Sequence, residues 1–218
     1  MARPMVVSWE AFPRAVLFAI MLLFLAVVAY VSMGTGGWVT YNADMLPNES
    51  GWMLSTYSKD PNLQTIREGV LDYLKPVAAH HYTYRNVGDL SNAAGTILEA
   101  RVRVVQGGMS PGYAEVPPFY YGAYLAISDG SKHAGLSVGD GYVQLGRQLF
   151  KLDTLGGFHT YRLELKGNLA SAYVDGKLVA ASIPVDSGDK RIEWGVSSSS
   201  NTGYAESLWD YVKYKIGI

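Results

Sequence analysis

The stretch that most constrains the fold is residues 158–181, in which apolar and polar side chains alternate. Every second residue of 161–166 is apolar, which is the period of a β-strand with one buried face. A second alternating run, 170–175, follows a Lys-Gly-Asn turn, and Asp175-Gly176 then precedes a third run. Asp-Gly between alternating runs is a strong β-hairpin signal. The stretch therefore predicts three consecutive antiparallel strands that need a larger sheet to pack against.

Short alternating runs recur along the chain with turn residues between them. Residues 96–105, 191–197 and 207–216 follow this pattern, and the more apolar run 120–128 predicts a central strand. Strands of this length separated by turn signals are typical of a β-sandwich. The chain has 218 residues, which is enough for one ordinary domain and an appendage. We therefore predict a mainly β fold.

Composition excludes several classes of function. The formal net charge is −1 and no basic block occurs, which argues against a nucleic-acid partner. The chain has no cysteine, so it has no disulfide, thiolate metal site or cysteine nucleophile. Adjacent His80 and His81 would point to opposite faces of a strand, so they do not predict a shared metal ion.

The appendage is an uncharged apolar run at residues 15–33. About 20 such residues span a bilayer as a helix, and the run exceeds the roughly 7–15 residues of a signal-peptide core, the alternative interpretation. Arg3 and Arg14 precede it, and no Lys or Arg follows until Lys59. By the positive-inside rule, we expect a single-pass inner-membrane protein with a cytoplasmic N-terminus and a periplasmic or extracellular C-terminal domain.

Aromatic residues near both ends of this run suit the two membrane interfaces. The predicted anchor and interface residues are Trp9, Phe12, Arg14, Tyr30, Trp38 and Tyr41. The expected organisation is a cytoplasmic segment at 1–14, a transmembrane helix at 15–33, a linker at 34–50 and a β-sandwich at 51–218.

Two motifs give the β-region a family resemblance. Residues 172–177 read Ala-Tyr-Val-Asp-Gly-Lys, and residues 209–212 read Trp-Asp-Tyr-Val. Together with the order of the strands, they resemble the concanavalin A-like lectin/glucanase superfamily, in its laminin-G-like branch. The resemblance covers about residues 51–218 and implies a jelly roll of two curved antiparallel sheets. The motifs are structural, so they indicate the fold rather than the function.

The sequence does not predict catalysis. Retaining glucanases need two carboxylates about 5 Å apart, and no Glu-x-Asp-x-Glu strand occurs. Glu99 and Glu164 each have basic residues at alternate positions nearby, which favours charge pairing on a solvated sheet face over a site. We therefore expect no enzyme and no cofactor, although calcium, bound by some laminin-G-like domains, stays possible.

Two functions stay open for a non-catalytic domain. The first, which we favour, is an accessory or structural subunit of a larger membrane complex, such as a photosynthetic or respiratory one. Its expected partners are the bilayer and the other subunits. The short linker supports this interpretation, because it would hold the domain near the membrane. The alternative is a membrane-anchored carbohydrate-binding module, because aromatic side chains can stack on sugars. The candidate docking or glycan surface consists of Tyr113, Phe119, Tyr120, Tyr121 and Tyr142.

Overall fold

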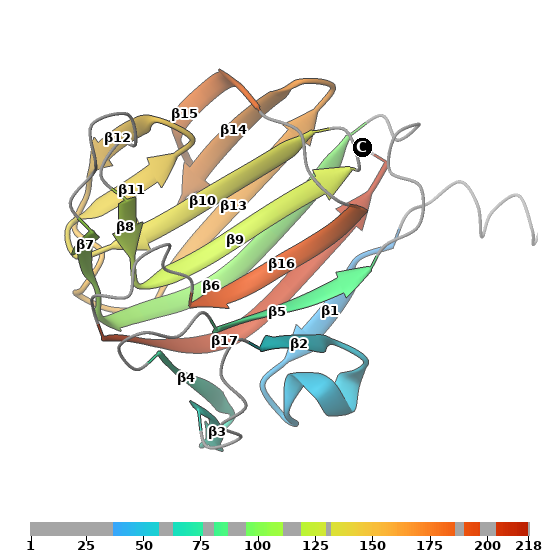
Figure 1. Ribbon diagram of the computed structural model, residues 1–218, viewed down its shortest axis with the longest axis vertical. Helices are drawn as coiled ribbons and strands as arrows, with labels where there is room; N and C mark the ends of the chain where they lie inside the picture. The colour runs from blue at the N-terminus through green and yellow to red at the C-terminus, as the bar shows by residue number, and fades with distance from the viewer. Residues whose placement is uncertain are drawn as a thin grey trace, which may run out of the picture. The chain divides into compact units, whose positions relative to one another are not determined.

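A computed structural model shows two layers of antiparallel strands (Figure 1). The predicted two-sheet β-sandwich is confirmed. The chain divides into residues 1–37 and a compact unit of residues 38–218, and the second unit is described by itself. The structure describes residues 37–56, 63–75, 81–86, 95–110, 119–129, 132–185, 190–196 and 204–217.

One layer, here the β6 sheet, has the strand order β15-β14-β13-β6-β17-β4-β3, and β1 also pairs with β17. The predicted three-strand stretch is confirmed as β13, β14 and β15, which pair in succession. The strands are β1 (Val39–Asn42), β3 (Gln64–Arg67), β4 (Val70–Lys75), β6 (Thr96–Gln106), β13 (His159–Lys166), β14 (Leu169–Val174), β15 (Lys177–Pro184) and β17 (Ala205–Ile216).

The other layer, here the β9 sheet, has the order β12-β11-β10-β9-β16-β5-β2. It lies nearer the viewer in Figure 1. A separate β7–β8 pair and the 3-10 helix η2 complete the described elements. These are η2 (Pro47–Ser50), β2 (Met53–Thr56), β5 (His81–Asn86), β7 (Gly108–Ser110), β8 (Phe119–Tyr121), β9 (Ala123–Asp129), β10 (His133–Gly139), β11 (Tyr142–Leu145), β12 (Gln148–Lys151) and β16 (Lys190–Val196).

Aromatic side chains fill one part of the core between the sheets. The ring of Trp194 lies 5.0 Å from that of Trp209 and 5.1 Å from that of Tyr41, and the ring of Trp52 meets it edge-on at 5.6 Å. All four side chains are buried. Rings at these separations add favourable edge and offset contacts to the burial of apolar area. The segments that carry them, which include β1, β16 and β17, are therefore held together here.

Strand β17 departs from the strict alternation that its sequence predicts. Trp209 and Val212 are both fully buried although they are three positions apart. The pairing of β17 with β6 shifts between Trp209 and Tyr211, so Asp210 is an extra residue in a β-bulge. A bulge reverses the inward and outward positions beyond it, which returns Val212 and Tyr214 to the core.

The described part of the expected linker belongs to the sandwich. Residues 39–42 form β1 and pair with β17. Tyr41, expected at a membrane interface, is instead a core residue with 2% of its surface exposed, and its hydroxyl donates a hydrogen bond to the carbonyl of Met45. Alternation in β1 turns Tyr41 inward, whereas Trp38 is exposed.

The expected anchor falls on residues 15–33, which lie outside the described residues, as do Trp9, Phe12, Arg14 and Tyr30. Within the described residues, the structure contains no helix of the length and apolar character that a membrane crossing needs.

Candidate functional site

The outward face of the β9 sheet carries polar side chains that are largely withdrawn from solvent. Leu125 and Ile127 of β9 are buried in the core, so their neighbours Tyr124 and Ser128 point to the opposite side. The strand register places His133 of β10 directly opposite Ser128. Polar side chains from two strands therefore meet at one end of the β9–β10 hairpin.

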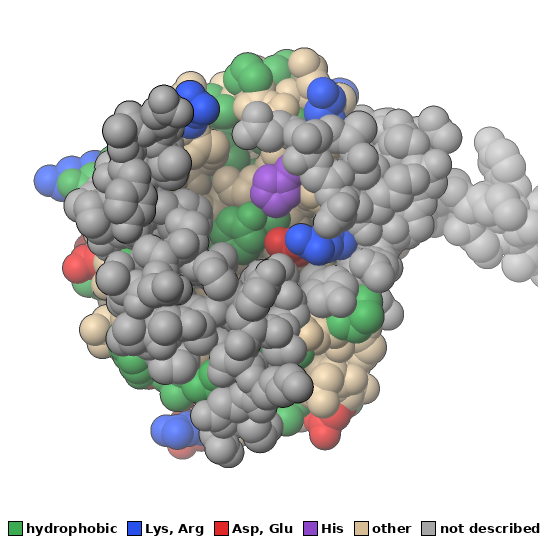
Figure 2. All heavy atoms as spheres, viewed as in Figure 1, with side chains coloured by type: hydrophobic (Ala, Val, Ile, Leu, Met, Phe, Trp, Pro, Cys, Tyr) green, Lys and Arg blue, Asp and Glu red, His purple; other side chains and the backbone are tan. Residues whose placement is uncertain are grey.

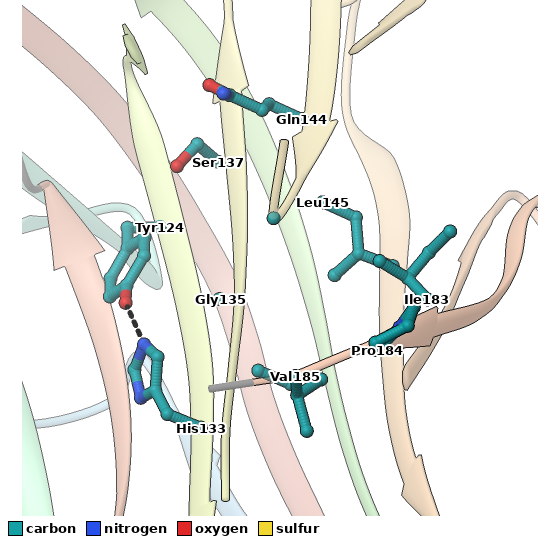
Figure 3. Close-up of a pocket in the computed structure, with 11 residues that line it drawn as sticks. Tyr124, His133, Gly135, Ser137, Gln144, Leu145, Ile183, Pro184 and Val185 are labelled. Carbon is teal, nitrogen blue, oxygen red and sulfur yellow. Dashed lines mark hydrogen bonds between the residues drawn. The ribbon is translucent and has the colours of Figure 1, made fainter. Parts of the chain in front are cut away.

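His133 links its two neighbours in a hydrogen-bonded chain. Its Nδ1 atom lies 2.8 Å from Oγ of Ser128, and its Nε2 atom lies 3.1 Å from the hydroxyl of Tyr124 (Figure 3). Ser128 is 1% exposed. In one tautomer, Nδ1–H donates a hydrogen bond to Ser128, and Nε2 accepts a hydrogen bond from the Tyr124 hydroxyl. In the other tautomer, Nε2–H donates a hydrogen bond to the tyrosine oxygen. The chain can therefore move a proton to or from the Tyr124 hydroxyl.

Gly135 makes room for this arrangement. A Cβ atom at this position would lie 2.8 Å from the Tyr124 hydroxyl oxygen and 3.3 Å from Nε2 of His133. The first distance is shorter than any ordinary carbon–oxygen contact, so a side chain here would displace the tyrosine. The absence of a side chain at Gly135 thus leaves the space that the Tyr124 hydroxyl occupies beside His133.

The Tyr124–His133 pair opens onto a cavity of about 170 Å³. Its polar lining includes Ser137 and Gln144, beyond Tyr124 along β10 and β11. Its apolar wall faces the pair from across the cavity (Figure 3) and consists of Leu145, Ile183, Pro184 and Val185. Figure 2 shows a histidine near the centre of this side of the molecule, with basic and acidic side chains next to it. The cavity combines proton-transfer groups with an apolar surface.

A buried ion pair lies on the neighbouring strand β16. Glu193 is 4% exposed, forms an ion pair with Nε of Arg191, and stands opposite Ala126 of β9. Among the described side chains on this outward face, Glu193 is the one carboxylate. Glu193 is therefore paired with a cation, and it is not among the residues that line the cavity.

The predicted surface aromatics do not line this cavity where the structure describes them. Tyr121 is a core residue with 9% exposed, and Tyr142 is half-buried at the start of β11. Phe119 and Tyr120 belong to β8, but their side chains lie outside the described residues, as does all of Tyr113. Whether these residues bind a partner or glycan stays a prediction.

The site residues predicted from the sequence do not include His133, Ser128 or Glu193. The signal that could have found the first two is the hairpin between 120–128 and 134–138, because its register places a histidine beside outward-facing Ser128. Among the described residues, no cluster of three or more His, Asp or Glu side chains is arranged to hold a metal ion.

Comparison with known proteins identifies the fold. No family model matches the sequence, and no curated protein does. Solved structures match along most of the chain. The β-glucanase of Bacillus licheniformis is 13% identical, with a TM-score of 0.57 over 83% of this chain and 99% of the other. A transglycosylase is 12% identical, with a TM-score of 0.56 over 82% and 83%. An alginate lyase of polysaccharide lyase family 7 is 9% identical, with a TM-score of 0.55 over 80% and 100%.

These similarities confirm the resemblance to the concanavalin A-like superfamily at the level of the fold. They also correct two predictions. The expected non-catalytic accessory subunit and the expectation of no enzyme are both contradicted, because the matching structures include a β-glucanase, a transglycosylase and an alginate lyase. The expectation of no enzyme rested on the absence of one carboxylate pattern and did not consider Tyr124 and His133, which the structure brings into hydrogen-bond contact on this face.

Proposed function

We propose that the domain is a carbohydrate-active enzyme that cleaves a polysaccharide bound along the outward face of the β9 sheet. The observation that carries this proposal is the Ser128–His133–Tyr124 hydrogen-bonded chain at the cavity. The glucanase, transglycosylase and lyase names of the matching structures support the substrate class. The residues at the cavity decide between the possible reactions.

Hydrolysis with retention uses two carboxyl groups about 5 Å apart, one as nucleophile and one as acid. The described part of this face offers Glu193, and Arg191 neutralises it. Elimination needs a base and an acid instead, and His and Tyr commonly fill these roles. The geometry therefore favours a lyase reaction on a polysaccharide that contains uronic acid.

In that reaction, the Tyr124–His133 pair removes the proton at C5 of the uronate. The electron pair of the C5–H bond forms a C4–C5 double bond, the bond from C4 to the glycosidic oxygen breaks, and that oxygen receives a proton from the same pair. The step needs no oxidant or second substrate. Gln144 lines the cavity, and its amide can donate a hydrogen bond to the uronate carboxylate, which stabilises the charge that develops during proton removal.

The test incubates the purified full-length chain with alginate, polygalacturonate and mixed-linkage β-glucan. Reducing ends and the ultraviolet absorbance of the unsaturated product are measured together. We expect the ultraviolet absorbance to rise with a uronate polymer. The cleavage rate should be at least about 100-fold lower in Tyr124→Phe and in His133→Ala than in the wild type. Tyr204→Phe, whose hydroxyl bonds Glu206 at the start of β17, is the matched control. No cleavage of any polymer, or equal rates in all variants, would overturn the proposal.

We further propose that residues 15–33 anchor the enzyme in the inner membrane, with its N-terminus in the cytoplasm and residues 38–218 outside. The support is the length of the uncharged run and the basic residues before it. Alkaline extraction of membranes should leave the chain in the pellet. Protease added outside spheroplasts should reach residues 38–218, and recovery of the chain in the soluble fraction would contradict the anchor.

A further inference from the structure

The outward face of the β6 sheet holds an ordered row of side chains that the proposed reaction does not use. The register places Tyr173, Arg162, Glu99 and Lys213 directly opposite one another on β14, β13, β6 and β17. Neighbouring strands lie about 4.8 Å apart, so the row extends over about 14 Å. An elongated ligand can follow it across four strands.

The charged groups in this row are held in place by one another. Nζ of Lys213 lies 2.8 Å from Oε1 of Glu99, and the hydroxyl of Tyr211 donates to the same oxygen at 3.0 Å. Burial and this bond raise the pKa of Tyr211, which keeps its hydroxyl a donor. Arg162 pairs with Glu164, the outward residue two positions along β13. These side chains are already fixed, so binding would cost little conformational entropy.

A hollow of about 180 Å³ opens beside the row. Its lining includes Glu99, Thr160, Arg162, Glu164 and Tyr173. The side chains of Glu99 and Glu164 are only 13% and 21% exposed, which is low for carboxylates on an outer sheet face. They therefore form the wall of a depression rather than extending into solvent.

Aromatic rings stand at both ends of the row. The guanidinium of Arg162 lies 5.5 Å from the ring centre of Tyr173, and Nζ of Lys213 lies 4.7 Å from that of Trp38. Trp38 is 42% exposed. Sugar rings present apolar C–H surfaces that pack on aromatic side chains, while hydroxyls bond polar groups between them.

We propose that this row is a second carbohydrate-binding site that takes a neutral, hydroxyl-rich sugar chain. Two carboxylates and two cations balance in charge, so neither an anionic nor a cationic ligand is favoured. The carboxylates retain lone pairs that accept from hydroxyl groups, and the guanidinium retains donors. The site lies on the opposite sheet from Tyr124 and His133, and the proposal stands independently of their chemistry.

The experiment is affinity electrophoresis of the full-length chain in detergent, in gels that contain mixed-linkage β-glucan, xylan or mannan. We expect at least one neutral polymer to retard the wild type, and Tyr173→Ala and Glu164→Gln to lower its affinity about tenfold. Val105→Ala, an exposed side chain on β6 that lies six positions along the strand from Glu99, is the matched control. Thermal unfolding of each variant verifies that it is folded.

The outcomes separate this proposal from the proposed reaction. Tyr124→Phe should keep its retardation by the neutral polymer, and Glu164→Gln should keep the cleavage rate on soluble uronate oligosaccharides. No retardation by any of the three polymers, or retardation unchanged in folded Tyr173→Ala and Glu164→Gln, overturns the second site. Retardation lost in Tyr124→Phe instead places neutral-sugar binding at the β9 sheet and also overturns it.

Discussion

The two outward faces of the sandwich differ in the interactions that hold most of their polar side chains in place. On the β9 sheet, a hydrogen bond joins Ser128 to His133 at the cavity, and Arg191 and Glu193 form an ion pair on β16. On the β6 sheet, charged groups such as Arg101 and Asp210 neutralise one another across strands, with donor and acceptor 2.5 Å apart. A hydrogen-bonded chain can exchange protons, whereas a set of ion pairs holds fixed charge. This difference underlies our two proposals, proton transfer on one face and ligand recognition on the other.

The largest effect expected comes from crowding the proton-transfer pair without removing either member. Gly135→Ala introduces a Cβ 2.8 Å from the hydroxyl of Tyr124, so the ring must move away from His133. The cleavage rate should fall about 1,000-fold, within the usual contribution of positioned acid–base groups. Stability should change by less than about 1 kcal/mol, because the displaced atom ends a side chain that can rotate.

Gly157→Ala is the matched control for this substitution, because a Cβ at Gly157 meets nothing within 4 Å. Its rate and unfolding midpoint should both match those of the wild type. A Gly135→Ala protein that cleaves at the wild-type rate would show that the position of the Tyr124 hydroxyl does not affect cleavage. The proposed proton transfer on the β9 sheet would then be contradicted.

The next effect tests whether the Arg191–Glu193 ion pair on the β9 sheet contributes more to stability than the ion pairs on the other sheet. Glu193→Ala removes the carboxylate that pairs with Arg191. The Arg191 side chain is only 30% exposed, so water replaces that carboxylate only in part. Removing one partner of a buried pair is strongly destabilising, and we expect a loss of about 2–3 kcal/mol in the free energy of unfolding. Urea denaturation measures it, and a loss below about 1 kcal/mol, the usual limit for an exposed pair, would contradict the prediction.

The corresponding change on the β6 sheet should be small. Arg101 is 45% exposed at its side chain and pairs with Asp210, and its guanidinium lies 4.9 Å from the ring centre of Phe158. Exposed pairs contribute about 0–1 kcal/mol, and such a cation–ring contact adds about 0.5 kcal/mol. Arg101→Ala should therefore cost about 1 kcal/mol or less in the same denaturation series. A cost equal to that of Glu193→Ala would remove the distinction between the faces.

Local signals explain why most of the fold was predictable. Asp175-Gly176 predicts a turn from two adjacent residues alone, without knowledge of the rest of the fold. The alternation of apolar and polar residues in β6 and β13 indicates which side of each strand is buried. The bulge at Asp210 was not predictable, because it depends on how β17 pairs with β6. A single extra residue there determines whether Val212 points inward.

The site was less predictable than the fold because its members are joined by pairing rather than by sequence pattern. Tyr124 and His133 come together through the β9–β10 register, and Ile183 of the apolar wall comes from β15 of the other sheet. Glu193 has no sequence motif, and only the pairing of β16 with β9 places it beside Ala126. Chemistry that depends on such long-range placement requires the three-dimensional structure.

The smallest effect concerns Asp175, in the turn that first indicated the fold. Burial raises its pKa, but hydrogen bonds from His159, at 2.7 Å, and from the amide of Thr160, at 2.9 Å, outweigh it, so the pKa lies below its ordinary value. A carboxyl with a lowered folded-state pKa adds stability above its unfolded-state pKa and loses it as the pH falls through the folded-state value. Since the side chain is 51% exposed, screening limits this contribution to about 0.5 kcal/mol.

Asp175→Asn isolates that charge, because asparagine tolerates the left-handed backbone at this position, where φ is 49°. The variant should be less stable than the wild type near neutral pH, and the difference should close in acid, below the ordinary aspartate pKa of about 4. In a His159→Ala background the same substitution should cost less, because the two residues form one interacting pair. A difference in stability between the two proteins that stays constant from neutral to acid pH would contradict this prediction. It would mean that the substitution removes an uncharged contact in the turn rather than the effect of the negative charge. The turn between β14 and β15 would then owe none of its stability to the ionised carboxylate.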